Sequence, residues 1–149
     1  MAGLRDDLGF LLAWVSGEVV RAANASLAPE GLRVRQYSVL QLARDFPDGV
    51  SQRQLARELG LDPSQIVSLV DELAAAGLVE RRPAATDRRT RLVTATEAGE
   101  RKLAYAAELA ADGVRDALRA LSEDEQETLR ALLARVACPP PDAAESRAR

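Results

Sequence analysis

The chain has 149 residues and a net charge of −3, and 47% of its residues are hydrophobic while only 3% are aromatic. This length allows one domain that buries roughly 70% of its unfolded surface, and an apolar content made largely of alanine and leucine favours helix over sheet. No apolar run approaches the ~20 residues of a membrane span, and the single cysteine excludes an internal disulfide. The absence of histidine argues against a transition-metal site. We therefore expect no membrane partner, no metal and no cofactor.

The charge is unevenly distributed along the chain. Acidic residues gather near the C-terminus, from Glu123 to Glu127, whereas arginines gather between positions 81 and 91. An acidic body with a local basic edge is compatible with binding to nucleic acid. The first seven residues carry acids where a secretion signal needs positive charge, so we expect a cytoplasmic protein.

A long amphipathic helix is predicted for residues 4 to about 24, where apolar residues recur every three or four positions. Phe10, Leu12 and Trp14 add apolar surface on its other faces. A helix that is apolar on more than one face is buried on more than one side, as a dimer would bury it. A second helix is predicted for residues 34 to 44, after a break that contains proline and glycine.

Two short helices separated by a tight break come next. Ser51 and Gln54 fit a capping box that opens a helix running to about Leu59. Asp62 is a good N-cap residue, and Pro63 stands at the first helical position, where its missing N–H costs nothing. These signals predict a helix-turn-helix.

A basic β-hairpin is predicted directly after these helices. Two β-prone runs, residues 78–82 and 90–95, flank a polar tip at residues 83–89. Residues 81–91 contain five arginines against one acid, Asp87, which suits contact with phosphate or the minor groove. Two helices followed by a basic hairpin are the layout of a winged helix-turn-helix.

The C-terminal part is predicted to be helical again. Thr96 can cap a long helix over residues 97 to about 120, and Ser122 with Glu125 forms a second capping box that opens a last helix ending near Ala137. We expect a disordered tail at residues 139–149. The predicted fold is mainly α with a small β-hairpin wing: residues 1–32 and 97–138 form a helical dimerisation region, and residues 33–96 form a winged helix-turn-helix.

The order of these elements, together with three short motifs, resembles the MarR family, the multiple-antibiotic-resistance regulators of bacteria and archaea. The motifs are Leu69-Val70-Asp71-Glu72-Leu73, then Gly77-Leu78-Val79-Glu80-Arg81, then Asp87-Arg88-Arg89 followed by Leu92, Thr96 and Gly99. The resemblance covers residues 4 to 137. It implies a homodimeric winged-helix DNA-binding protein whose first and last helices, with part of the long fifth helix, pair into a dimerisation domain. It also implies a repressor of nearby genes that a small, often phenolic, molecule releases from DNA.

The second helix of the helix-turn-helix carries the candidate base readers. Ser64, Gln65 and Ser68 lie on its predicted exposed side, and the N-terminus of that helix enters the major groove in this fold. Glutamine can pair with adenine, and serine can bond several bases. An ordinary solvated face would show the same residues. The family often has Thr-Arg where this chain has Val67-Ser68, so a basic base reader is missing here.

The hairpin carries the second group of candidates. Arg89 matches the wing arginine of the family, and a guanidinium fits the narrow, negative minor groove of A·T-rich DNA. We expect Asp87 to pair with it and hold its orientation. Phosphate contacts are expected from arginines in the wing and in the first helix of the motif, namely Arg88 and Arg91, and Arg53 and Arg57. A solvated charge of little energetic value is the alternative.

Three further residues are candidates for a functional role. Trp14 and Tyr37 could line an effector pocket between the dimer helices and the winged region, because amphipathic aromatics suit flat phenolic ligands; core packing explains them equally well. Cys138 invites a redox interpretation, but it follows the last helix and has no nearby base except Arg135, so we interpret it as an incidental thiol.

The predicted function is that of a homodimeric, sequence-specific transcriptional regulator, a repressor released by a small aromatic effector. Its partners would be an inverted repeat of double-stranded DNA and a second copy of the chain. The alternative is a winged-helix module that binds protein and not DNA, which the retained arginines at 88, 89 and 91 disfavour. An enzyme is disfavoured because the chain has no histidine, no Gly-rich phosphate loop and no nucleophile beside a base.

Overall fold

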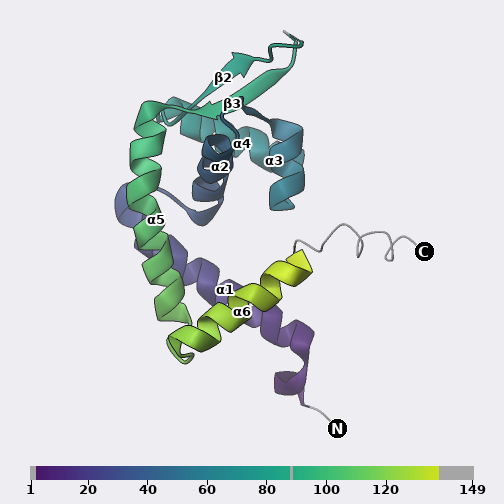
Figure 1. The fold of residues 1–149 in the computed structure, drawn as a ribbon, viewed down its shortest axis with the longest axis vertical. Coiled ribbons are helices and arrows are strands. Elements are labelled where there is room, and N and C mark those ends of the chain that lie inside the picture. The colour runs from purple at the N-terminus through teal and green to yellow at the C-terminus, as the bar shows by residue number, and fades with distance from the viewer. Residues whose placement is uncertain (1–2, 88, 138–149) are drawn as a thin grey trace, which may run out of the picture.

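The computed structural model describes residues 3–87 and 89–137. A winged region stands at one end of the molecule, and the long helix α5 leads from it to a second region that holds α6 and the N-terminal part of α1 (Figure 1). The helices are α1 (Leu8–Leu27), α2 (Val34–Asp45), α3 (Gln52–Leu59), α4 (Pro63–Ala75), α5 (Glu97–Ala117) and α6 (Glu123–Ala137). The strands are β1 (Val50–Ser51), β2 (Val79–Pro83) and β3 (Arg91–Ala95), and 3-10 turns occupy Leu4–Asp6 and Ala28–Glu30.

The wing is a three-stranded antiparallel sheet with the order β1-β3-β2. In β3, Leu92 lies opposite Arg82 of β2 and Ser51 of β1. The sequence predicted the β2–β3 hairpin correctly but missed β1. Two residues are too short for the alternating pattern that marks a strand, and β1 exists only because β3 supplies its hydrogen-bonding partner.

One hydrophobic core lies beneath the sheet, in the winged region. Its largest fully buried side chains come from α2, α3, α4, β1 and β3 and from the adjoining parts of α1 and α5: Leu27, Val39, Leu40, Val50, Leu55, Ile66, Val70, Leu73, Val93 and Leu103. The core therefore fixes α4 and the sheet on one rigid base, with α5 attached to it.

A tight joint holds the start of α5 against the start of the wing. The Thr96 hydroxyl donates to the carbonyl of Gly77 at 2.7 Å and accepts from the N–H of Gly99 at 3.0 Å. A Cβ on Gly99 would lie 2.0 Å from the carbonyl oxygen of Leu78, so only glycine allows this approach. The Thr96…Gly99 motif is therefore a packing feature that seats α5.

The ends of the predicted helices need three corrections. Helix α1 begins at Leu8, not at residue 4, because the Asp7 carboxylate caps it by accepting from the N–H of Phe10 at 2.7 Å. It also continues to Leu27, beyond the predicted end at 24, and α5 ends at Ala117, before the predicted end at 120. The capping box of Ser122 and Glu125 is confirmed, with bonds of 2.8 and 3.3 Å.

Three further predictions concern the C-terminal end of the chain, membrane-spanning helices and the division into two regions. Cys138 and the tail at 139–149 lie outside the described residues. Within residues 3–87 and 89–137, none of the helices combines the length and apolar character that crossing a bilayer requires. The division into a dimerisation region and a winged region stays a prediction.

Candidate nucleic-acid interface

Helix α4 has one buried side and one exposed side. Ile66, Leu69, Val70 and Leu73 face the core. The three predicted base readers, Ser64, Gln65 and Ser68, are all exposed. The structure therefore places them on the surface of the predicted recognition helix, as a DNA contact requires.

Two of these three residues already have partners within the molecule. The side-chain oxygen of Gln65 accepts from the N–H of Asp62 at 3.3 Å, at the N-terminus of α4. The Ser68 hydroxyl donates to a carboxylate oxygen of Glu72 at 3.3 Å. Among the described residues, Ser64 has no such side-chain bond. The amide nitrogen of Gln65 and the hydroxyl of Ser64 have no partner among the described residues, and the Ser68 oxygen can still accept a hydrogen bond.

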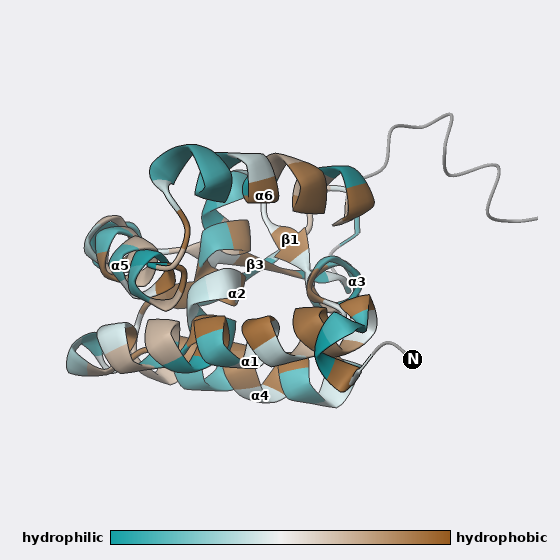
Figure 2. Ribbon diagram, turned by 90° about the horizontal axis from the view of Figure 1, so that it is seen from below, coloured by the Kyte–Doolittle hydropathy of each residue, from teal (hydrophilic) through white to brown (hydrophobic). Residues whose placement is uncertain are grey.

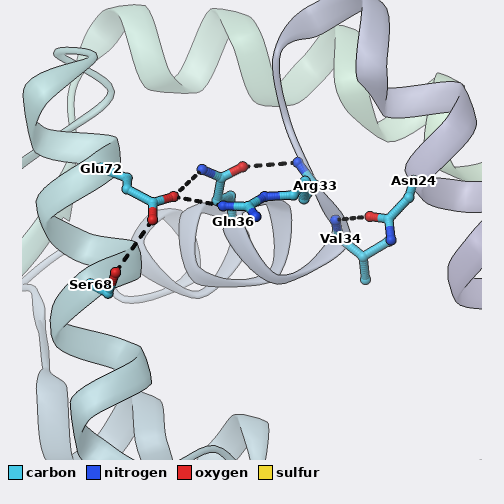
Figure 3. Close-up of polar contacts among 6 residues, drawn as sticks. All are labelled: Asn24, Arg33, Val34, Gln36, Ser68 and Glu72. Carbon is cyan, nitrogen blue, oxygen red and sulfur yellow. Dashed lines mark hydrogen bonds and ion pairs between the residues drawn. The ribbon is translucent and has the colours of Figure 1, made fainter.

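Glu72 is the centre of a cluster that joins α4 to the start of α2 (Figure 3). Its Oε2 accepts from Arg33 Nη2 at 2.9 Å and from Gln36 Nε2 at 2.7 Å. The Gln36 side chain also accepts from the N–H of Arg33 at 2.9 Å. The carboxylate thus connects the C-terminal half of the recognition helix to the segment that follows α1.

A neighbouring hydrogen bond extends this connection to α1. The Asn24 side-chain oxygen accepts from the N–H of Val34 at 2.8 Å (Figure 3). Asn24, Arg33, Gln36 and Glu72 did not emerge from the sequence, since their contacts join residues 10, 36 and 39 positions apart. No local pattern signals a contact of that separation.

A cavity of about 290 Å³ opens between α1, α2 and α4. Its lining combines apolar side chains with two arginines and one carboxylate: Val20, Asn24, Arg33, Val34, Arg35, Gln65, Ser68, Leu69 and Glu72. The cavity therefore borders the recognition helix directly, and a molecule bound in it would touch the Glu72 cluster.

In the wing, Asp87 closes the tip of the hairpin. Its carboxylate accepts from the backbone N–H of Arg89 at 2.9 Å and from the hydroxyl of Thr90 at 3.1 Å. The sequence predicted that Asp87 pairs with the Arg89 guanidinium, but the carboxylate bonds the Arg89 backbone instead. The difference arises because a short side chain two residues before an N–H reaches it more easily than it reaches the end of a long side chain.

The arginines of the wing fall into two groups. Arg81 forms an ion pair with Asp71 of α4, and Arg82 forms one with Glu80. Arg89 and Arg91 are exposed and take part in no ion pair among the described residues. Arg88 lies outside the described residues. Positive charge without an internal partner is thus concentrated toward the tip, where a DNA backbone would meet it.

The predicted phosphate contacts of α3 are also on the surface. Arg57 is 3.2 Å from Glu58, and Arg53 is exposed. Residues 33–96 contain ten arginines and eight acidic residues, a net charge of +2, whereas the rest of the chain carries −5. The winged region is therefore the part of the chain whose charge suits a polyanion.

The structure does not bring Trp14 and Tyr37 to the cavity. Trp14 is 61% exposed and lies beside Phe10, with ring centroids 5.8 Å apart. Tyr37 is half-buried and packs against the core. Neither residue lines the cavity beside α4. Among the described residues, no cluster of three or more His, Cys, Asp or Glu side chains could hold a metal ion.

A second, larger hollow, the α1–α5–α6 groove, lies at the other end of the molecule and has a volume of about 1040 Å³. Figure 2 shows apolar stretches along both α1 and α6. The apolar lining is Leu8, Leu11, Leu12, Val15, Val19, Val114, Leu118, Leu129 and Leu133. At its rim, a hydrogen bond from Arg130 holds the pKa of the Glu127 carboxyl below its ordinary value. None of the residues of α6 is buried in a single chain.

Comparison with known proteins assigns the fold to a family. The profile of the MarR family matches residues 30–90. The crystal structure of a MarR-family transcriptional regulator from Rhodococcus sp. RHA1 is similar, with 43% identity, a TM-score of 0.88, and coverage of 94% of this chain and 99% of that one. The likeness therefore extends over the whole described fold.

Two further structures were determined with ligands. CouR from Rhodococcus jostii RHA1, bound to p-coumaroyl-CoA, is 44% identical with a TM-score of 0.82, and the match covers 94% of this chain and 98% of CouR. A mutant of MarR from E. coli, complexed with operator DNA, is 29% identical with a TM-score of 0.76, and the match covers 87% of this chain and 92% of that one.

Proposed function

The chain belongs to the MarR family of DNA-binding transcriptional regulators, and from this we propose that it acts in the cytoplasm as a homodimeric repressor on an inverted repeat of double-stranded DNA. A small aromatic effector would release it from that DNA. The family consists of regulators and not of enzymes, and it favours DNA over the alternative of a protein-binding module.

The observation that carries the DNA contact is the exposed side of α4 together with the arginine-bearing wing. Ser64 and Gln65 lie in the first turn of α4, the part of a recognition helix that reaches base edges. Arg89 and Arg91 extend from the wing, where a guanidinium suits the minor groove. Arg53 and Arg57 of α3 would contact phosphates.

The second copy of the chain would fill the α1–α5–α6 groove. Leu8, Leu12 and Leu133 line the groove and are 69%, 48% and 45% exposed in the single chain. Exposed apolar surface of this extent is unfavourable in water, and burying it against a second copy would stabilise the dimer by about 25 cal/mol per Å² of apolar surface. A twofold dimer would also present two α4 helices to one face of the DNA.

The cavity beside α4 is our candidate for the effector site, in preference to Trp14 and Tyr37. Its apolar lining suits an aromatic ring, and Arg33 and Arg35 suit an anionic group. CouR, 44% identical, was solved with p-coumaroyl-CoA bound. At about 290 Å³ the cavity fits an aromatic acyl group but not a whole coenzyme A, so we propose an aromatic acyl-CoA whose nucleotide part extends outside.

Selection of bound duplexes from a randomised DNA pool tests the first part of the proposal. We expect an enriched inverted repeat with half-site centres about 10 base pairs apart. A pool without any enriched sequence would contradict it.

A mobility-shift titration with p-coumaroyl-CoA then tests the effector class, with free coenzyme A and p-coumarate as separate controls. We expect the thioester to release the DNA at concentrations at which the two controls do not. Equal release by coenzyme A alone would show that the aromatic group is not recognised.

A further inference from the structure

One large apolar side chain is exposed in the winged region. Val67 of α4 is 43% exposed, whereas every other large apolar residue described between positions 33 and 96 is buried or half-buried. The remaining exposed ones belong to α1, α5, α6 or the turn before α1: Leu4, Leu8, Leu11, Leu12, Trp14, Val15, Val20, Tyr105, Leu132, Leu133 and Val136. Val67 therefore has no counterpart elsewhere in this region.

Val67 lies on an exposed side of α4 between Ser64, which has no side-chain hydrogen bond among the described residues, and Asp71, which pairs with Arg81 of the wing. Ser64, three residues earlier, lies on the same exposed side, one helical turn away. Gln65, Ser68 and Glu72 lie toward the cavity and α2, with their side chains bonded within the molecule. Val67 lines neither the cavity nor the α1–α5–α6 groove. Neither the effector site nor the dimer interface explains its exposure.

We propose that Val67 is a specificity-determining residue that reads thymine in the major groove. The C5-methyl of thymine is the apolar group on the base edges of that groove, and an apolar side chain recognises it by contact. Valine can form no side-chain hydrogen bond, so it gains no favourable contact from the polar atoms of the other base edges. Its branched side chain has one strongly preferred rotamer in a helix, so little entropy is lost on contact.

The inference deepens the proposed function, because it requires α4 to enter the major groove. Beyond that function, it predicts the identity of a base. One thymine in each half-site should contribute through its methyl group, next to the base contacted by Ser64. The expected size is about fourfold in Kd per half-site, which corresponds to burying one methyl-sized apolar group at about 0.8 kcal/mol.

The test replaces thymine with uracil in a duplex obtained by selection. Uracil keeps the base pairing and the O4 acceptor and lacks only the methyl group. Kd is measured for wild type and for Val67→Ala on duplexes with each thymine replaced in turn. For wild type we expect a loss of about fourfold at one thymine position of each half-site, and about sixteenfold when both are replaced. Val67→Ala should bind the thymine and uracil duplexes alike.

Two controls make the outcome specific. Ser68→Ala, on the neighbouring position of α4, should retain the wild-type ratio of thymine to uracil affinity. Val67→Ala should retain the wild-type helical circular dichroism, because alanine is the best helix former and the site is exposed. Val67→Ser, which also removes both methyl groups, provides a second variant with the same expected ratio.

Other outcomes overturn the inference or the function beneath it. A thymine-to-uracil loss of the same size in Val67→Ala would show that the methyl group acts through another residue or through DNA stiffness. Equal binding of wild type to thymine and uracil duplexes would show that no thymine methyl group contributes to affinity, which also overturns the inference. Failure of wild type to bind any selected duplex would instead overturn the proposed docking of α4.

Discussion

At the scale of single residues, the wing owes its DNA-binding potential to how its charges are paired. Arg81 and Arg82, in strand β2, are held by acidic partners, and the Asp87 carboxylate bonds the backbone of the tip. Arg89 keeps its charge available because Asp87 binds its N–H and not its guanidinium. An acidic residue beside a wing arginine can therefore fix the backbone of the tip without neutralising the charge of the arginine.

Replacing Arg89 by alanine should weaken operator binding by about 1–3 kcal/mol, the range for one good contact to DNA. The thermal unfolding midpoint should not change, because the side chain is exposed outside any core. Binding isotherms at several salt concentrations measure the effect.

Arg57→Ala is the matched control for this change. Its side chain is 72% exposed and has Glu58 as a partner, so we expect a smaller loss, equal on operator and random DNA, and a salt slope lower by about one. If both variants lose the same affinity on both kinds of DNA, the wing supplies only bulk charge.

Glu72→Ala should raise the affinity for p-coumaroyl-CoA. Glu72 and Arg33 both line the cavity, and the Glu72 carboxylate accepts a hydrogen bond from the Arg33 guanidinium, so an anionic ligand must compete with Glu72 for this donor. The free energy of unfolding should change by less than about 1 kcal/mol, because both partners of the ion pair are largely exposed. Calorimetric titration of the DNA-free protein measures the ligand affinity.

Glu58→Ala removes the same charge from α3, away from the cavity lining. It should leave the ligand affinity close to that of wild type. An equal increase in both variants would mean that net charge alone controls binding of the anion.

At the scale of elements, the seating of α5 against the wing depends on Gly99. A Cβ at this position would lie 2.0 Å from the Leu78 carbonyl oxygen and 3.1 Å from a methyl carbon of Leu40. Gly99→Ala should therefore lower the free energy of unfolding by about 1–3 kcal/mol or more, measured by thermal or urea denaturation at fixed protein concentration.

The matched substitution is Gly17→Ala in α1, where an added Cβ has no neighbour within 4 Å in the chain. It should leave stability unchanged or raise it by up to about 1 kcal/mol, since alanine favours helix over glycine. A similar loss in both variants would contradict the role given to the close approach at Gly99.

Elements held by local hydrogen bonds could be predicted from the sequence, whereas those held by distant partners could not. The caps at Ser51 and Ser122 were predictable because their bonds span three residues. Strand β1 was not, because Val50 pairs with Val93, far along the chain. The same holds for Glu72, whose partners at 33 and 36 become neighbours only after α2 and α4 pack together. Surface placement of the base readers followed from helical periodicity, but their internal partners did not.

At the scale of the whole molecule, the two hollows are lined by neighbouring parts of α1 and serve different proposed partners: Val19 lines the groove, and Val20 lines the cavity. The α1–α5–α6 groove is wide and apolar, and the cavity beside α4 is small and carries two arginines. Helix α1 connects them, and α5 packs along α1 with Gly113 close to Ala22 and Ser26. Dimer geometry and the spacing of the two α4 helices are therefore mechanically linked, so a change at the interface should appear as a change in DNA binding.

Leu133→Glu should convert the dimer into a monomer of about 16.0 kDa, because it places a charge in the apolar groove that the second copy must cover. Light scattering after size exclusion at micromolar concentration measures the mass, and wild type should give twice that value. The core of the winged region contains no residue of α6, so the fold of the winged region should persist in the monomer.

A monomer carries one α4 and one wing. It should therefore bind an operator and its isolated half-site equally weakly, whereas wild type should strongly prefer the full repeat with centres about 10 base pairs apart. Tyr105→Glu, at an exposed position of α5 outside the groove lining, should stay dimeric and keep that preference. A wild-type mass of one chain, or full operator affinity in a monomeric Leu133→Glu, would show that the groove is not the dimer interface.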